Sequence, residues 1–133
     1  MEIANKYLEM AVTTASPERL ILLLYDGAIN FLTRAMEAIS ARDFTEANRL
    51  IIRVEEIITE LKNSLDTSYE IGKSLEKFYD LLLARLFAAN VAKDREVLLE
   101  VQRYLKEMRS TWEEAIKQAA PCLTSFSSKG LEV

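Results

Sequence analysis

The sequence contains no histidine, a single cysteine (Cys122), two prolines and three glycines among its 133 residues. The lack of histidine excludes Ser-His-Asp hydrolysis, Cys-His proteolysis, phosphotransfer through histidine and His-ligated zinc, since each of these needs an imidazole. It also excludes the di-iron sites of helical bundles, which need Glu-x-x-His pairs. A single thiol can neither close an intrachain disulfide nor supply a four-thiolate metal site. We therefore expect a protein that is not an enzyme and carries no metal or cofactor.

The scarcity of glycine and proline also argues against an all-β domain with many tight turns. The length fits one domain, and a hydrophobic content of 50% argues against disorder of the whole chain. The net charge of −4 and a pI near 5.0 argue against a nucleic-acid partner. No uncharged apolar run approaches the roughly 18 residues that span a bilayer, and residues 1–6 do not start a secretory signal. These features predict a soluble, cytoplasmic protein without membrane insertion.

Apolar residues recur at spacings of three and four along most of the chain, which is typical of amphipathic helices. Ser16 can cap a helix and Pro17 is tolerated at its first position, so a helix should begin there. Thr45 and Asp94 are expected caps of later helices, and Pro121 prevents continuation of the last one. Long helices joined by short turns predict an all-α protein, an antiparallel four-helix bundle. The expected helices span about 16–41, 46–65, 69–92 and 94–118.

The chain is expected to have three parts: an N-terminal segment over 1–15, the bundle over 16–118 and a flexible, Ser-rich tail over 119–133. Whether residues 1–15 also contain a short extra helix stays open.

The first and third predicted helices are richer in apolar residues than a bundle requires. Apolar residues fill 14 of the 20 positions 20–39 and 12 of the 15 positions 78–92. The second and fourth helices have only 9 in the 21 positions 45–65 and 10 in the 24 positions 95–118. That lower density is close to the roughly three in seven expected when one face is buried. Two explanations for the surplus stay open: a terminal segment that folds back over it, or an exposed apolar groove that receives another chain.

The charged residues have ordinary helix-surface contexts. Glu55, Glu56 and Glu60 lie beside Arg53 and Lys62, which predicts a solvated face. No carboxylate has a context that suggests a raised pKa, and no glycine-rich loop is present to hold phosphate.

One set of short motifs and single residues stands out for its order and spacing over about 105 positions. The set is Thr14–Pro17, Leu20–Ile21, Leu24–Ala28, Ala35, Ile39, Asp43, Ala47, Glu60–Leu61, Ser64–Asp66, Leu75, Tyr79, Leu86, Ala89–Asn90, Asp94, Leu105 and Trp112–Glu113. Each piece is individually weak, because helix caps and core positions recur in many bundles, but their joint order is specific. In this order and spacing the chain resembles the flagellin export chaperone (FliS) family. Many family members carry glycines directly after the second helix, whereas this chain has only Gly72 there, and the tail after Gln118 does not match.

The resemblance implies a cytoplasmic export chaperone. Its client would be the disordered C-terminal region of flagellin, which drives filament polymerisation. Binding would prevent premature polymerisation and assist secretion by the flagellar export apparatus, and it stays open whether export components also bind. The resemblance further implies a client-proximal tyrosine, for which Tyr7 is the matching position.

Eight residues are candidates for client binding. Tyr7, Leu8 and Met10 are expected to form a movable cover over the groove. Leu20, Leu24, Ala28 and Leu32 lie four residues apart on one stripe, which suits either a groove or the core, and Tyr25 lies beside that stripe.

A second hypothesis is a structural bundle that self-associates through its surplus apolar face. The sequence leaves the oligomeric state open: the chain is either a monomer or a weak homo-oligomer.

Overall fold

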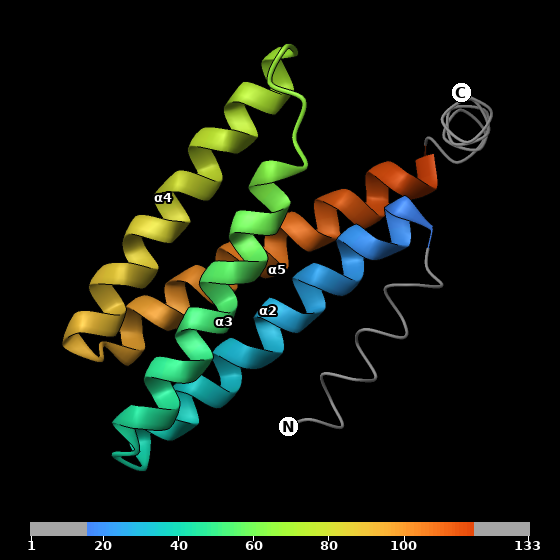
Figure 1. Ribbon diagram of the computed structural model, residues 1–133. Coiled ribbons are helices and arrows are strands. Elements are labelled where there is room, and N and C mark those ends of the chain that lie inside the picture. Colours follow the sequence, from blue (N-terminus) through green and yellow to red (C-terminus); the bar gives the residue numbers. More distant parts are fainter. Residues whose placement is uncertain (1–15, 119–133) are drawn as a thin grey trace.

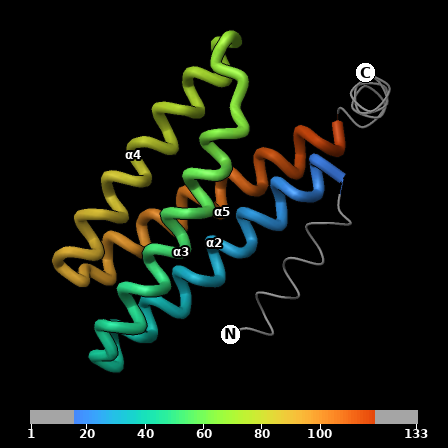
Figure 2. Tube along the Cα trace, in the orientation of Figure 1, coloured from blue at the N-terminus to red at the C-terminus, as the bar shows by residue number. Residues whose placement is uncertain are grey.

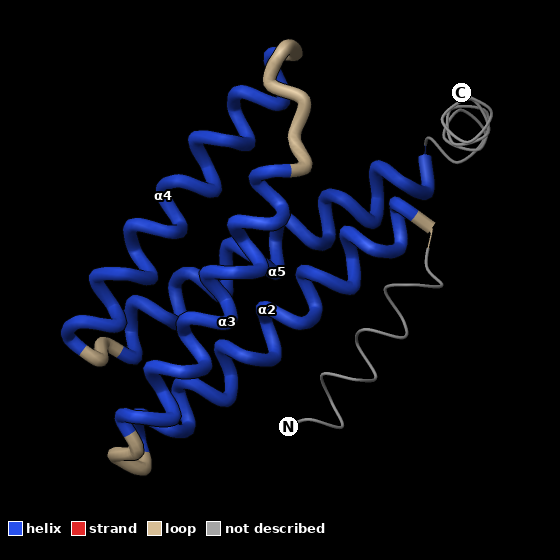
Figure 3. Tube along the Cα trace, viewed as in Figure 1, coloured by secondary structure: helices blue, strands red, loops and turns tan. Residues whose placement is uncertain are grey.

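The computed structural model describes residues 16–118, and these residues form four helices and no strand (Figures 1 and 3). The helices, in chain order, are α2 (Pro17–Ser40), α3 (Phe44–Asn63), α4 (Glu70–Ala92) and α5 (Arg95–Gln118). Each helix packs against two others, and α2 and α4 lie diagonally opposite, as do α3 and α5. The predicted antiparallel four-helix bundle is therefore confirmed for the part of the chain that the structure describes.

Three of the four helices begin at side-chain caps. The Ser16 hydroxyl accepts a hydrogen bond from the Arg19 amide at 3.3 Å, and Asp94 accepts one from the Glu96 amide at 3.0 Å. Asp43 caps α3 by accepting from the Glu46 amide at 3.1 Å. The prediction of Thr45 as that cap is wrong, because the aspartate two residues earlier reaches the free amides and starts the helix at Phe44.

Helix α4 begins differently, after the loop 64–69. Its N-cap position is Tyr69, whose side chain makes no capping hydrogen bond. Instead the loop doubles back on the helix: a Cβ on Gly72 would lie 2.0 Å from the carbonyl oxygen of Asp66. Only glycine fits this close approach, so Gly72 fixes how the loop meets α4.

The two ends of the bundle differ. Short turns join α2 to α3 and α4 to α5 at one end, where Arg42 and Lys93 adopt left-handed conformations (Figure 2). At the other end Figure 1 shows the pair α2 and α5 diverging from the pair α3 and α4. We call this second end, which carries Pro17, the loop 64–69 and Gln118, the open end.

The core is apolar and joins all four helices. One buried polar side chain, Gln102 on α5, donates hydrogen bonds to the Ile29 carbonyl at 3.0 Å and the Thr33 hydroxyl at 2.8 Å. Because both acceptors belong to α2, these bonds fix the rotation of α5 against α2.

Candidate functional site

Helix α4 exposes a continuous apolar surface over its last three turns. Leu81, Phe87 and Val91 are 51%, 67% and 73% exposed, and Ala84 and Ala88 lie exposed between them. We call these five residues the α4 apolar face. Large apolar side chains at such exposure are unusual for a monomer, and a cluster of them is typical of a surface that binds another chain.

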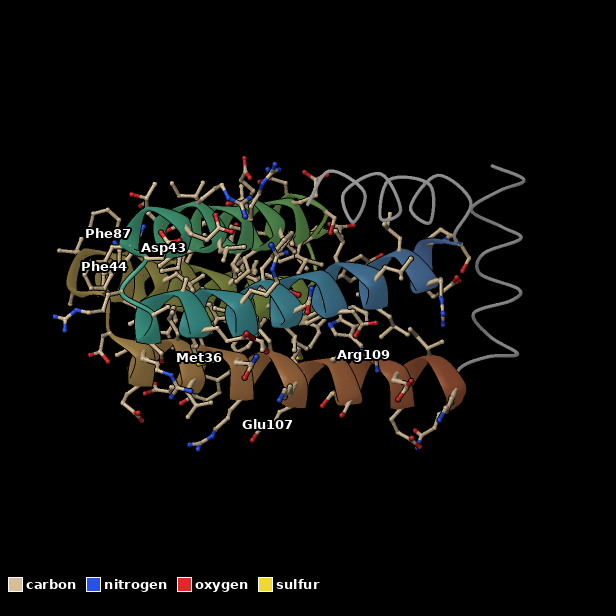
Figure 4. The ribbon with its side chains drawn as sticks, turned by 90° about the horizontal axis from the view of Figure 1, so that it is seen from below. Met36, Asp43, Phe44, Phe87, Glu107 and Arg109 are labelled. Carbon is tan, nitrogen blue, oxygen red and sulfur yellow. The ribbon has the colours of Figure 1, made fainter. Side chains whose placement is uncertain are left out.

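Helix α3 extends this face at the end opposite the open end. Phe44 and Ile52 are 43% and 42% exposed. The Asn90 amide of α4 donates to the Asn48 amide oxygen of α3 at 2.8 Å, which places the last turns of α4 beside the first turns of α3. Figure 4 shows Phe44 and Phe87 at this same end of the bundle. The apolar surface therefore crosses from α4 onto α3.

Ion pairs flank the face rather than occupy it. Lys62 of α3 contacts Asp80 at 2.6 Å, and this hydrogen bond raises the pKa of Lys62. Arg85 of α4 contacts Glu100 of α5 at 2.7 Å. Since these charges already have partners along both seams of α4, the area between them is left to apolar side chains.

One carboxylate near the α3–α4 seam departs from the expected surface behaviour. Partial burial raises the pKa of Glu55 above its usual range. No sequence context suggested a raised pKa at this position, because the shift arises from packing: the helix places Glu55 on the same side as Asn48 and Ile52, against α4.

The stripe predicted on the first helix lies partly in the core. Leu20 and Leu24 are half-buried on α2, whereas Ala28 and Leu32 are 0% exposed. Of the two interpretations left open for this stripe, the core applies to Ala28 and Leu32. These two side chains have no surface to offer another chain while the bundle is closed.

Tyr25 also lies in the core, where it meets α4. Its hydroxyl lies 2.6 Å from the Tyr79 hydroxyl, and both rings are almost fully buried. Burial is the main cause that raises the pKa of each tyrosine, so both are neutral at physiological pH. This pair joins the two diagonally opposite helices through a hydrogen bond.

A pocket opens between the diverging pairs of helices at the open end. Its cavity volume is about 400 Å³, and all four helices and the loop 64–69 contribute to its walls. We call it the open-end pocket. Its main apolar walls are Ile21 of α2, Leu61 and Leu65, Leu75 and Tyr79 of α4, and Trp112 of α5.

The remaining candidates, Tyr7, Leu8 and Met10, lie outside the described residues. The same holds for the N-terminal cover over 1–15 and the tail over 119–133.

The residues of the α4 apolar face were missed as candidates, although the sequence signalled them. The apolar surplus over 78–92 includes Leu81, Phe87 and Val91. Apolar density alone could not say which of these residues point outward, since that depends on how α4 is rotated against its neighbours.

No described helix is long and apolar enough to cross a membrane. The described residues hold no group of three or more Cys, Asp and Glu that could bind a metal ion.

Comparison with known proteins gives a consistent result. The sequence profile of the family described as "Flagellar protein FliS" matches residues 1–119. The "Flagellar secretion chaperone FliS" of Bacillus subtilis (strain 168) is 35% identical, over 88% of this chain and 90% of that protein. The protein of the same name from Salmonella typhimurium is 32% identical, over 88% and 89% of the two chains. "Flagellar secretion chaperone FliSB" of Pseudomonas aeruginosa is 34% identical, over 80% and 86%.

These relatives are secretion chaperones by name, which supports an export chaperone role and agrees with a four-helix bundle that exposes an apolar face. The match covers the whole described bundle. The chain belongs to the FliS family of flagellar proteins.

Proposed function

We propose that this chain is a cytoplasmic export chaperone that binds the disordered C-terminal region of flagellin. Binding prevents premature polymerisation and keeps the client competent for secretion by the flagellar export apparatus. The observation that carries the proposal is the α4 apolar face with its extension onto Phe44 and Ile52.

The physical reasoning concerns the cost of ordering the client. A disordered segment loses conformational entropy when it folds on a surface, so it needs a broad apolar contact to bind. An amphipathic client helix would cover Leu81, Phe87 and Val91 with its own apolar side chains, while Ala84 and Ala88 let it approach closely. Leu20 and Leu24 lie on α2, diagonally opposite α4, so a second part of a client that wraps around the bundle would contact them.

The test is isothermal titration with a peptide from the C-terminal region of flagellin. We expect saturable binding with a negative heat-capacity change, because apolar area is buried. Phe87→Asp should weaken binding by at least about tenfold, as expected when an anchor side chain is replaced by a charge. Ser110→Asp is the matched control. Ser110 is exposed on α5, so this substitution adds the same negative charge outside the α4 apolar face.

Equal loss of affinity in both variants would mean that charge, not this face, governs binding. Absence of any binding by the unmodified chain would remove flagellin as the client.

The alternative, self-association, would bury the same face between two copies. Size-exclusion mass measured over a range of concentrations separates the two hypotheses. A concentration-independent monomer that gains mass with the peptide supports the chaperone. A stable dimer that ignores the peptide and dissociates in Phe87→Asp supports self-association.

We further propose that residues 1–15 cover the client surface in the free protein, with Tyr7, Leu8 and Met10 as contacts. Tyr7 lies nine residues before Ser16 and Met10 six, which allows up to about 30 Å and about 20 Å of extended chain. Their contacts would therefore lie on the part of the client surface nearest the open end, where Leu20 and Leu24 are half-buried. Deletion of residues 2–15 should then raise client affinity. Unchanged or lower affinity would contradict the cover and would make these residues dispensable or direct contacts.

A further inference from the structure

Two polar contacts join α3 to α4 across the seam beside the α4 apolar face. The Asn90 amide donates to the Asn48 amide oxygen at 2.8 Å, and Lys62 lies 2.6 Å from Asp80. The two contacts run in opposite directions along the helices, so the stretch of α3 between them lies opposite the stretch of α4 between them. Glu55 is seven residues from both Asn48 and Lys62, which places it midway on the same face of α3. The α3 side of the seam therefore carries three polar positions in line, and Glu55 is the middle one.

The part of α4 opposite Glu55 offers it no cation. Leu83 and Phe87 lie three and seven residues after Asp80, so they are on the side of α4 that meets α3. Leu83 packs against the core, and Phe87 belongs to the α4 apolar face. The one charged residue between the two seam contacts on α4 is Arg85, which forms an ion pair with α5 instead. Glu55 thus faces apolar side chains.

Helix α3 does not neutralise this carboxylate either. Glu55 makes no ion pair or hydrogen bond with any residue between 16 and 118. The nearest cation along the helix, Arg53, contacts Glu56 at 3.8 Å. Glu55 is half-buried, and loss of hydration is the sole cause of its raised pKa. The other two polar positions of the seam have partners, whereas Glu55 has given up part of its water without a counter-charge.

A client helix on the α4 apolar face would bury this carboxylate further. Such a helix covers Phe87 on one side of the seam and Ile52, three residues before Glu55, on the other. An unpaired carboxylate that loses its remaining water opposes binding, and a cation of the client removes that penalty. The penalty falls on amphipathic segments that lack a basic side chain at this point, although the apolar surface alone would accept them. Glu55 can therefore select among clients.

We propose that Glu55 is a specificity-determining residue of the client surface, which pairs with a lysine or arginine at the edge of the apolar stripe of the client helix. The pair also fixes the register of that helix along the seam. This inference rests on the proposed function of the α4 apolar face, and it adds the chemical class of the segment that the face selects: an amphipathic helix with a basic residue beside its apolar side chains.

The test measures the coupling between Glu55 and the basic residues of a client. Isothermal titration compares the unmodified chain and Glu55→Gln, each with a peptide from the C-terminal region of flagellin and with versions in which every lysine and arginine is replaced by glutamine in turn. Glu55→Gln should weaken binding of the unmodified peptide on the order of tenfold, because the pair is covered in the complex. One peptide substitution should cause a similar loss with the unmodified chain and no further loss with Glu55→Gln.

Glu60→Gln is the matched control, because it removes the same charge from the same helix. Glu60 is exposed and lies five residues from Glu55, about 140° around the helix, so it points away from the seam. This variant should bind every peptide as the unmodified chain does. Urea unfolding separates recognition from folding: Glu55→Gln should unfold at the same or a higher urea concentration and yet bind the client more weakly. A residue needed only for folding would lose both properties together.

The outcomes distinguish this inference from the function on which it rests. Equal affinity of Glu55→Gln and the unmodified chain for the flagellin peptide would overturn the role of Glu55 and leave the chaperone proposal intact. A loss in Glu55→Gln that is the same for every peptide would also overturn it, because no basic partner would then be involved. Absence of binding by the unmodified chain would overturn the proposed function, and the selection by Glu55 with it.

Discussion

Helices α2 and α4 occupy equivalent places in the bundle, since each lies diagonally opposite the other and packs between α3 and α5. Both have an apolar surplus, with 14 apolar residues in positions 20–39 and 12 in positions 78–92. Helix α2 buries eight residues and has no large apolar side chain among the exposed ones, whereas α4 exposes Leu81, Phe87 and Val91.

The side to which the alanine side chains point explains why α2 buries its apolar residues and α4 exposes several of them. Ala28, Ala35 and Ala38 of α2 point into the core. Small side chains at a contact let two helices approach closely, so the larger side chains beside them reach neighbouring helices. Helix α4 buries one alanine, Ala89, but turns Ala84 and Ala88 outward among its exposed large side chains. The apolar surplus is therefore mostly buried in the core on α2, whereas on α4 part of it forms an exposed apolar face.

The comparison predicts unequal effects of the same substitution on the two helices. Leu32→Ala on α2 should lower the free energy of unfolding by about 3 kcal/mol, because it opens a cavity at a fully buried site. Leu81→Ala on α4 should change it by less than about 1 kcal/mol, since that side chain is already half in water. Urea unfolding measures the free energy of unfolding of both variants, and the comparison holds if their m-values equal that of the chain that lacks the substitution. Both substitutions are compared in the chain without residues 2–15, so that the proposed cover does not contribute. Similar losses for the two would then contradict an exposed α4 apolar face.

Enlarging the alanines tests the packing argument from the opposite direction. Ala35→Leu should destabilise the bundle by about 2 kcal/mol, because the α2 contact has no room for the added atoms. Ala88→Leu should leave thermal stability nearly unchanged and should instead alter affinity for the client peptide. A tolerated Ala35→Leu would contradict close packing of α2.

Tyr25 and Tyr79 are the point where the two helices meet. Tyr25→Phe or Tyr79→Phe alone should cost about 1–2 kcal/mol, because each leaves the other hydroxyl buried without its partner. The double variant should cost less than the sum of the two single variants, and a double-mutant cycle measures this coupling. Additive losses would show that the two hydroxyls do not depend on each other.

The sequence predicted the four helices because their caps and apolar periods are local signals. Ser16, Asp94 and the break after Leu65 each mark a boundary that the structure confirms within two residues. The exposed face could not be located in the same way, because it depends on how α4 is rotated in the bundle. Periodicity showed Ala28 and Phe87 as members of apolar arcs, and only packing placed one in the core and the other in water.

The smallest expected effect concerns Glu55, at the seam between α3 and the exposed helix. Burial raises its pKa in the folded state, so between the unfolded and folded pKa values the folded chain holds a proton that the unfolded chain has released. Stability from this group therefore falls as pH rises through that window and stays lower at neutral pH. Glu55→Gln should raise the free energy of unfolding at pH 7 by less than about 1 kcal/mol and flatten its dependence on pH between the unfolded and folded pKa values of Glu55. Glu56→Gln, on the exposed side of the same helix, is the control and should leave that slope unchanged. A slope that persists in Glu55→Gln would show that another carboxylate governs the acid side of the profile.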